Sequence, residues 1–256
     1  MTNQIAVTVA LNKGGTGKTT TVQALMAGLV SKGYKVLAID LDGQGNLSVA
    51  TGASRTKTTI YDVLVNGSDI NKAVQRTSYG DIIASSPNLA NLDTIMSRTI
   101  GKEFRLRDEM ANLKQRYDFV LIDTPPSLGV ELYNALTYSD YVLFAVQPDS
   151  FSINGMDMVG KTVISQIRKN MNPNLRILGI LLTRCKKRTD LYKQSRELFS
   201  QIAKEMDTRL FESAISDSVH IQEIQSYSVE FYSNSRNTAI KDYRAFVDEF
   251  LKEVQA

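Results

Sequence analysis

A glycine-rich segment near the start of this 256-residue chain has the spacing of a phosphate-binding loop. It follows an apolar, β-prone run and precedes a helical pattern, and it consists of Gly14, Gly15, Thr16, Gly17, Lys18, Thr19 and Thr20. Glycines let backbone amides turn towards an anion, and a helix N-terminus adds partial positive charge. We therefore expect the segment to bind nucleotide phosphates, with Lys18 reaching the β- and γ-phosphates and Thr19 ligating Mg²⁺.

The front of this segment departs from the common phosphate-loop pattern G-x-x-x-x-G-K-[ST]. Asn12 stands where that pattern has its first glycine, and Lys13 adds a second lysine at the entrance of the loop. The departure indicates a narrower class of nucleotide-binding protein than the loop alone would.

Two further segments place carboxylates at the ends of expected strands. Asp40 and Asp42 follow one apolar run, and Asp123 ends another. The carboxyl ends of parallel strands share one edge of a sheet, where ligands collect. A carboxylate at that edge can hold Mg²⁺ through its water shell or orient an attacking water for in-line displacement. Pro125 and Pro126 follow Asp123 closely, so helix capping is the weaker account of that residue.

Alternating strands and helices must position these side chains. Apolar, β-prone runs predict strands at residues 5–11, 35–40, 81–84, 119–123, 141–146, 177–183 and 209–215. Helical patterns lie near residues 20–31, 104–113, 132–138, 156–169, 191–205 and 239–254. This alternation predicts an α/β fold with a single doubly wound, mostly parallel sheet and helices on both faces.

The organisation of the chain indicates one domain over residues 1–256. Residues 51–100 are the least regular and are rich in Ser, Thr and Asn. They are either surface loops with short helices or a partner-facing switch region, and the sequence does not distinguish the two.

The composition excludes several classes of site. Cys185 is the only cysteine and His220 the only histidine, so a disulfide framework, a cysteine-bound cluster and a histidine-rich metal centre are excluded. No apolar run reaches about 18 residues and no signal-peptide pattern is present, which predicts a cytosolic protein. The formal net charge of +3 is too small to indicate nucleic-acid binding by itself, because local clusters matter more.

Taken together, the three segments resemble the deviant Walker ATPases of the ParA/MinD family. The marks of that family are a K-G-G-x-G-K-[ST] loop, a strand ending in D-x-D and an apolar strand ending in D-x-P-P. Further matches, which look like the ParA/Soj branch, are Arg105, Leu106, residues 117–127, Asn134, Ala135, Leu136, Gln147, Leu181, Leu182 and Thr183. The resemblance implies a P-loop ATPase that uses ATP and Mg²⁺ and forms ADP and phosphate.

The resemblance also implies a role for each residue. Lys13 reaches across an ATP-bound homodimer to the phosphates of the other subunit, where a second positive charge stabilises the transition state. Lys18 is the loop lysine, and Asp42 positions the attacking water. The residues in the places of the metal site are Thr19, Asp40 and Asp123. Later loops of the family recognise adenine, in regions that match Thr183, Arg184 and residues 220–225.

ParA-type ATPases segregate plasmids or chromosomes. Their ATP-bound sandwich dimer binds DNA without sequence preference, and a ParB-type centromere-binding protein stimulates hydrolysis and release. The resemblance therefore implies a bacterial cytoplasmic, nucleoid-associated protein that does not act on a membrane. Only 12 residues precede Lys13, so we expect no N-terminal helix-turn-helix extension.

Nonspecific DNA binding requires clustered basic side chains. One candidate cluster follows an expected strand and contains Arg184, Lys186, Lys187 and Arg188. The family often has an arginine in the segment that matches residues 216–222, but this chain has none there. A second candidate surface therefore comprises Arg236, Lys241 and Arg244. The alternative for both clusters is an ordinary solvated surface.

Two rival functions stay open at this point. Gly43 follows Asp42 where the family usually has proline, and glycine does not pre-set the backbone φ. The hydrolysis rate is therefore open, and a nucleotide-binding module with little turnover is one alternative. The other is a MinD-like membrane-associated positioning ATPase. However, residues 240–254 carry mixed charge and an apolar stripe that more often packs on a core than on a membrane.

Overall fold

The computed structural model describes residues 4–221, 224, 231–234 and 236–255. Within these residues eight strands form one sheet in the order β3-β4-β2-β5-β1-β6-β7-β8, and all neighbouring strands are parallel except β3 and β4. The strands are β1 Ile5–Ala10, β2 Val36–Asp40, β3 Val74–Thr77, β4 Gly80–Ile83, β5 Phe119–Asp123, β6 Tyr141–Val146, β7 Arg176–Cys185 and β8 Leu210–Ser216. The expected mostly parallel α/β fold is confirmed.

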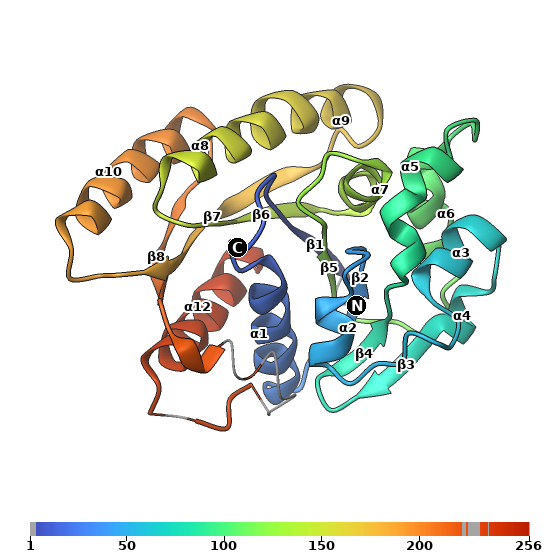
Figure 1. Ribbon diagram of the computed structural model, residues 1–256, viewed down its shortest axis with the longest axis horizontal. Coiled ribbons are helices and arrows are strands. Elements are labelled where there is room, and N and C mark those ends of the chain that lie inside the picture. Colours follow the sequence, from blue (N-terminus) through green and yellow to red (C-terminus); the bar gives the residue numbers. More distant parts are fainter. Residues whose placement is uncertain (1–3, 222–223, 225–230, 235, 256) are drawn as a thin grey trace.

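Helices cover both faces of this sheet (Figure 1). One face carries α1 Lys18–Ser31, α2 Asn46–Ala50 and α12 Thr238–Val254. The other face carries, along the chain, α3 Ile60–Asn66, α4 Ile70–Ala73, η1 Pro87–Asn91, α5 Leu92–Ile95, η2 Lys102–Phe104, α6 Arg105–Met110, α7 Val130–Tyr138, α8 Ser150–Asp157, η3 Met158–Ile164, α9 Ser165–Asn170 and α10 Asp190–Glu205.

The strands alternate their side chains between these two helical layers. Val7 and Val9 of β1 lie in the core beneath α1 and α12, whereas Ala6 and Ala10 face the opposite layer. Every residue of β5 is buried. Central strands that are covered on both faces bury both sets of side chains, which is why their sequences are continuous apolar runs.

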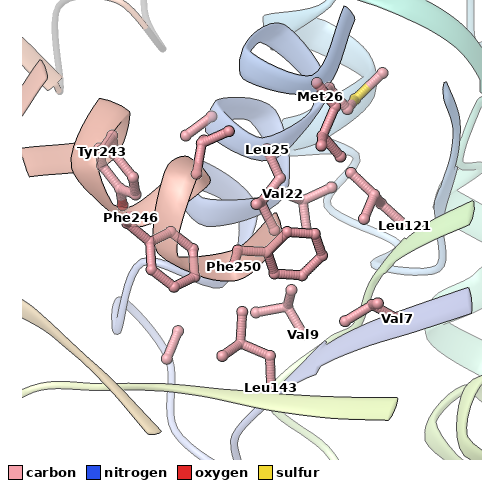
Figure 2. Packing of buried hydrophobic residues seen from close by; sticks show 14 of the residues in the cluster. Val7, Val9, Val22, Leu25, Met26, Leu121, Leu143, Tyr243, Phe246 and Phe250 are labelled. Carbon is pink, nitrogen blue, oxygen red and sulfur yellow. The ribbon is translucent and has the colours of Figure 1, made fainter. Parts of the chain in front are cut away.

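The last helix closes the core on the face that α1 covers. Figure 2 shows Phe246 and Phe250 of α12 beside Val22 and Leu25 of α1, over the strands that carry Val9 and Leu143. The helices approach closely, because a Cβ on Gly28 would lie 2.7 Å from Cγ2 of Val247. The apolar stripe of residues 240–254 therefore packs on the core, as the sequence predicted.

The observed elements differ from the expected ones in three places. The antiparallel edge strand β3 and the short helix α2 were not predicted. The helix expected at residues 156–169 begins earlier, at Ser150, because Asp149 accepts a hydrogen bond from the amide of Ser152 and caps it. It also contains a π-helical turn, η3. Residues 51–100 hold short helices and loops together with the strands β3 and β4.

We expect Phe250→Ala to lower the free energy of unfolding by about 3–5 kcal/mol, because it removes a fully buried ring that contacts Phe119 and Phe246. Urea denaturation followed by circular dichroism measures the change. Ile100→Ala, at a side chain that is 99% exposed, is the control and should change stability by less than about 0.5 kcal/mol. Equal effects of the two substitutions would contradict the packing role of α12.

Candidate functional site

The register of the sheet brings two of the predicted carboxylates side by side. Asp40, the last residue of β2, pairs in register with Asp123, the last residue of β5. β5 in turn lies beside β1, whose C-terminal end leads into the glycine-rich loop. The three segments singled out from the sequence therefore meet at one edge of the sheet.

The loop that follows β1 is held from outside by side chains of the neighbouring strand ends. The Thr183 hydroxyl donates to the Thr16 carbonyl oxygen at 2.6 Å, and Nε2 of Gln147 donates to the Gly15 carbonyl oxygen at 2.8 Å. Gly17 caps α1 with φ +90°, a left-handed conformation that favours glycine. Because two loop carbonyls are bound to β6 and β7, the loop is fixed in shape at the N-terminus of α1.

The loop lysine is buried and turned back on the loop. Nζ of Lys18 donates to the carbonyl oxygen of Lys13 at 2.9 Å. Burial lowers the pKa of Lys18, while the nearby carboxylates of Asp123 and Asp42 act in the opposite direction. The ammonium group therefore lies between the loop and the carboxylates, where a bound phosphate could replace the carbonyl as its partner.

Asp123 is fully buried, and no described residue gives either of its carboxylate oxygens a hydrogen bond of good geometry, although the Thr19 hydroxyl lies near enough to act on it. Burial raises its pKa well above the usual range, and the charge of Asp40 adds to that rise, whereas the Thr19 hydroxyl and Lys18 oppose it. A buried carboxylate without hydrogen-bond partners is costly unless a cation compensates it. Carboxylate and hydroxyl oxygens suit Mg²⁺, so Asp123 and Thr19 fit the expected metal site.

Asp40 has a different environment from its neighbour in register. Its Oδ2 accepts hydrogen bonds from the Ser48 amide at 2.8 Å and from the Ser48 hydroxyl at 2.7 Å, and its Oδ1 accepts from the Asp42 amide at 3.2 Å. Burial raises the pKa of Asp40 to about 6 in spite of these bonds. Asp40 therefore orders the start of the loop that carries Asp42, in addition to its place beside Asp123.

Asp42 lies half-buried at the rim of the site. Its Oδ1 accepts a hydrogen bond from the Gln44 amide at 2.9 Å, and its side chain lines the cavity described below. Gly43, which follows it, lies against another segment, because a Cβ there would be 3.0 Å from the backbone nitrogen of Ala90. The turn after Asp42 is therefore in close contact with η1, which contains Ala90.

A cavity of about 600 Å³ opens in front of the loop. Its walls contain the predicted phosphate-binding residues together with side chains from the ends of β7 and β8 and from α12. They include Gly14, Gly15, Thr16, Gly17, Lys18, Thr19, Thr20, Asp42, Asn46, Thr183, Arg184, Asp217, Ser218 and Tyr243. The size is in the range of ligand pockets in proteins. Residues 222, 223 and 225 of the stretch expected near adenine lie outside the described residues.

Lys13, the second lysine at the entrance of the loop, contacts side chains of its own chain. Nζ of Lys13 lies 2.5 Å from Oδ2 of Asp149, and it also donates to Oε1 of Gln147 at 3.4 Å. The two charged side chains are 24% and 34% exposed. Solvent screens such a pair, so it contributes little to stability.

The basic residues expected at DNA are exposed, but several have acidic or backbone partners. Arg184 donates to the Gly15 carbonyl oxygen at 3.3 Å and lies 3.5 Å from Asp217, so it belongs to the wall of the cavity. Lys187 forms an ion pair with Asp242 of α12 at 2.7 Å. Arg244 lies over the ring of Tyr232. The remaining members of the two clusters, all exposed, are Lys186, Arg188, Arg236 and Lys241.

Sequence reasoning missed several residues near the site because no local pattern marks them. Ser48 donates to the carboxylate of Asp40, and Ser85 donates to the backbone carbonyl oxygen of Asp42. Arg55 donates to the next two carbonyl oxygens of that loop. Glu131, in the first turn of α7, is only 6% exposed. Burial raises its pKa to about 7, and the charges of Asp93 and Asp42 contribute to the rise.

Comparison with known proteins connects this geometry to a family. Residues 4–177 match the AAA domain family. The chromosome partitioning protein ParA of Caulobacter vibrioides is 34% identical over 229 residues, which cover 86% of this chain and 83% of ParA. The sporulation initiation inhibitor protein Soj of Bacillus subtilis is 33% identical over 225 residues, covering 86% of this chain and 87% of Soj. The chain belongs to the ParA/Soj family.

Solved structures support this assignment. A plasmid partition protein of Borrelia burgdorferi bound to AMPPNP is 28% identical and covers 98% of this chain and all of its own, with a TM-score of 0.82. Cobyrinic acid a,c-diamide synthase of Mycobacterium smegmatis, with bound ADP and magnesium, is also 28% identical, with coverages of 99% and 96% and a TM-score of 0.84. Both of these structures contain a bound nucleotide. None of the described helices is long and apolar enough to cross a membrane.

The raised pKa of Glu131 predicts a pH-dependent stability. Its pKa is near 4.3 in an unfolded chain and about 7 in the folded protein, so the folded state holds the proton more tightly. The carboxyl group therefore destabilises the fold increasingly as pH rises from about 4.5 to 7. Glu131→Gln should match the wild type at pH 4.5 and be about 1 kcal/mol more stable at pH 8, as measured by urea denaturation.

Glu197→Gln, at an exposed glutamate on α10, is the matched control and should show no such growth with pH. A variant at Glu131 that is less stable than wild type at pH 8 would show that the glutamate makes a favourable ionic contact instead.

Proposed function

We propose that this chain is a ParA-type ATPase for plasmid or chromosome segregation. It binds ATP with Mg²⁺, closes into a homodimer that binds DNA without sequence preference, and hydrolyses ATP under stimulation by a ParB-type partner. It acts in the bacterial cytoplasm, on the nucleoid. The observation that carries the proposal is the convergence of the loop lysines, Asp42 and the buried pair Asp40 and Asp123 on one cavity.

Nucleotide binding follows from the loop and the residues around it. The amides at the N-terminus of α1 and the ammonium of Lys18 bind phosphate oxygens. Thr19 and Asp123 would hold the metal, and Asp40, fixed by Ser48, adds a second negative charge to the metal site from the neighbouring strand. Mg²⁺ supplies neutralisation of the charge on the β- and γ-phosphates. Relatives with bound ADP and magnesium or with AMPPNP support this part of the proposal.

Hydrolysis follows from the position of Asp42. Its carboxylate lines the cavity and is held by the Gln44 amide. From this position it can accept a hydrogen bond from a water molecule and orient it towards the terminal phosphate. Lys13 contributes to the same step from the other subunit, after it leaves Asp149.

One carboxylate, that of Asp242, links the segments that carry the two candidate DNA clusters. Asp242 of α12 binds Lys187 through Oδ1 and the Ser216 amide through Oδ2, so the loop after β7, the end of β8 and α12 are joined. Lys186 and Arg188 are the chain neighbours of Lys187, Lys241 and Arg244 lie within two residues of Asp242, and all four are exposed. We propose that DNA phosphates bind across these segments.

The nearest rival, a membrane-associated relative, has less support in this structure. The apolar residues of α12 are buried against α1 and the sheet, so they are not available to insert into a bilayer. A nucleotide-binding module without turnover would bind nucleotide but release no phosphate, so measurements of phosphate release and of nucleotide binding distinguish it from an ATPase.

We expect Asp42→Ala to reduce ATP turnover about 100-fold or more while nucleotide binding is kept, because the carboxylate acts on water and not on the nucleotide. Lys18→Ala should lose binding itself. Steady-state phosphate release and fluorescent-nucleotide titration measure the two properties. Asp108→Ala, at an exposed carboxylate on α6, is the control. Turnover at the wild-type rate in Asp42→Ala would rule out its role in water activation.

DNA binding is tested by gel shift with ATP, with ADP and without nucleotide. We expect binding with ATP only, and a fall in affinity of several-fold or more in Lys186→Ala and Lys241→Ala, with a shallower dependence on salt because each lysine displaces counterions. Lys169→Ala, on α9, is the control and should bind normally. Binding to liposomes without binding to DNA would favour the membrane-associated alternative, and binding that ignores the nucleotide would contradict the switch.

A further inference from the structure

Arg55 lies on the loop that follows Asp42, although it comes from the irregular segment beyond α2. Its NH2 donates to the Gly43 carbonyl oxygen at 2.7 Å and its NH1 to the Gln44 carbonyl oxygen at 3.0 Å. Its Nε donates to the Ser85 carbonyl oxygen at 3.4 Å. One half-buried guanidinium therefore joins the loop after β2 to the segment after β4.

Gly45 provides the space for this contact. A Cβ at that position would overlap the guanidinium of Arg55, and the backbone there has φ +69°, which also favours glycine. The guanidinium of Arg55 can therefore lie against the loop because Gly45 has no side chain. A loop with two glycines in three residues would otherwise have high conformational freedom.

Ser85 completes the hold on this loop. Its hydroxyl donates to the Asp42 carbonyl oxygen at 2.5 Å, and its amide donates to the Ser48 hydroxyl, which binds Asp40. Three successive carbonyl oxygens, those of Asp42, Gly43 and Gln44, are thus bound by side chains from outside the loop. Among the described residues, the hydrogen bond that holds the Asp42 side chain comes from the Gln44 amide, which belongs to the same loop.

We infer that Arg55 is a positioning residue that fixes the loop after Asp42 so that its carboxylate faces the phosphate cavity. The inference rests on the proposed function for the role of Asp42. In this chain glycine occupies position 43, where the family resemblance leads one to expect proline. The stiffness that a proline ring would give to the turn is supplied here by a guanidinium bound to two carbonyls.

The test compares Arg55→Ala with Arg55→Lys in the full chain. For Arg55→Ala we expect kcat for ATP to fall about 10- to 100-fold with KM nearly unchanged, because the phosphate-binding residues stay in place while Asp42 is misplaced. Arg55→Lys should resemble Arg55→Ala, because a single ammonium cannot span both carbonyls. Ethylguanidinium at low millimolar concentration should restore part of the rate of Arg55→Ala, and ethylammonium should not.

The control is Arg168→Ala, because Nε of Arg168, on α9, likewise donates to a backbone carbonyl, that of Leu175 at 2.8 Å. It should leave kcat and KM unchanged. Amide hydrogen exchange of residues 41–50 provides a readout that does not depend on activity. We expect it to be faster in Arg55→Ala than in the wild type or in Arg168→Ala.

The outcomes separate the inference from the proposed function. If the wild type shows no turnover, the proposed function fails, and the exchange of residues 41–50 alone decides whether Arg55 holds the loop. Unchanged exchange in Arg55→Ala overturns the inference. A fall in turnover with a matching rise in KM and no rescue by ethylguanidinium also overturns it, because that result shows a general structural role.

Discussion

The site depends on the burial of two carboxylates at adjacent strand ends. The parallel register of β2 and β5 places Asp40 beside Asp123, and both are removed from water. Ser48 and the Asp42 amide compensate Asp40, but Asp123 has only the nearby Thr19 hydroxyl and Lys18 to oppose the cost of its burial among the described residues. The fold therefore contains a poorly compensated carboxylate near the loop lysine, where a cation and an anionic ligand together satisfy more groups than either does alone.

The surrounding elements keep this arrangement rigid. Helix α12 packs across α1, so the helix whose N-terminus faces the cavity is fixed to the core along its length. Thr183 and Gln147 bind the carbonyls of the glycine-rich loop, while Arg55 and Ser85 bind the carbonyls of the loop after Asp42. Both loops are thus fixed through their backbone carbonyl oxygens, while the side chains of Lys18, Thr19 and Asp42 line the cavity.

Much of this could be predicted from sequence, because it depends on local pattern. The continuous apolar runs identify central strands, and glycine spacing followed by a helical pattern identifies the phosphate loop, so the meeting of Gly14–Thr20 with Asp40 and Asp123 follows from topology. The edge strand β3 could not be predicted, since its four residues VQRT are only partly buried and show no alternation of buried and exposed positions. Arg55, Glu131 and the partner of Lys13 were not predicted either, because each makes its contacts with residues far away in the chain.

The ion pair between Lys13 and Asp149 has a consequence for how readily the lysine can change partners. Oδ1 of Asp149 accepts the Ser152 amide and caps α8, and Oδ2 binds Lys13. If Lys13 leaves for a phosphate in the proposed dimer, the cap remains and the freed oxygen meets solvent, so no helix has to unravel. The pair is partly exposed and is worth at most about 1 kcal/mol. Breaking this pair therefore costs the donating subunit little, and the cap of α8 stays intact.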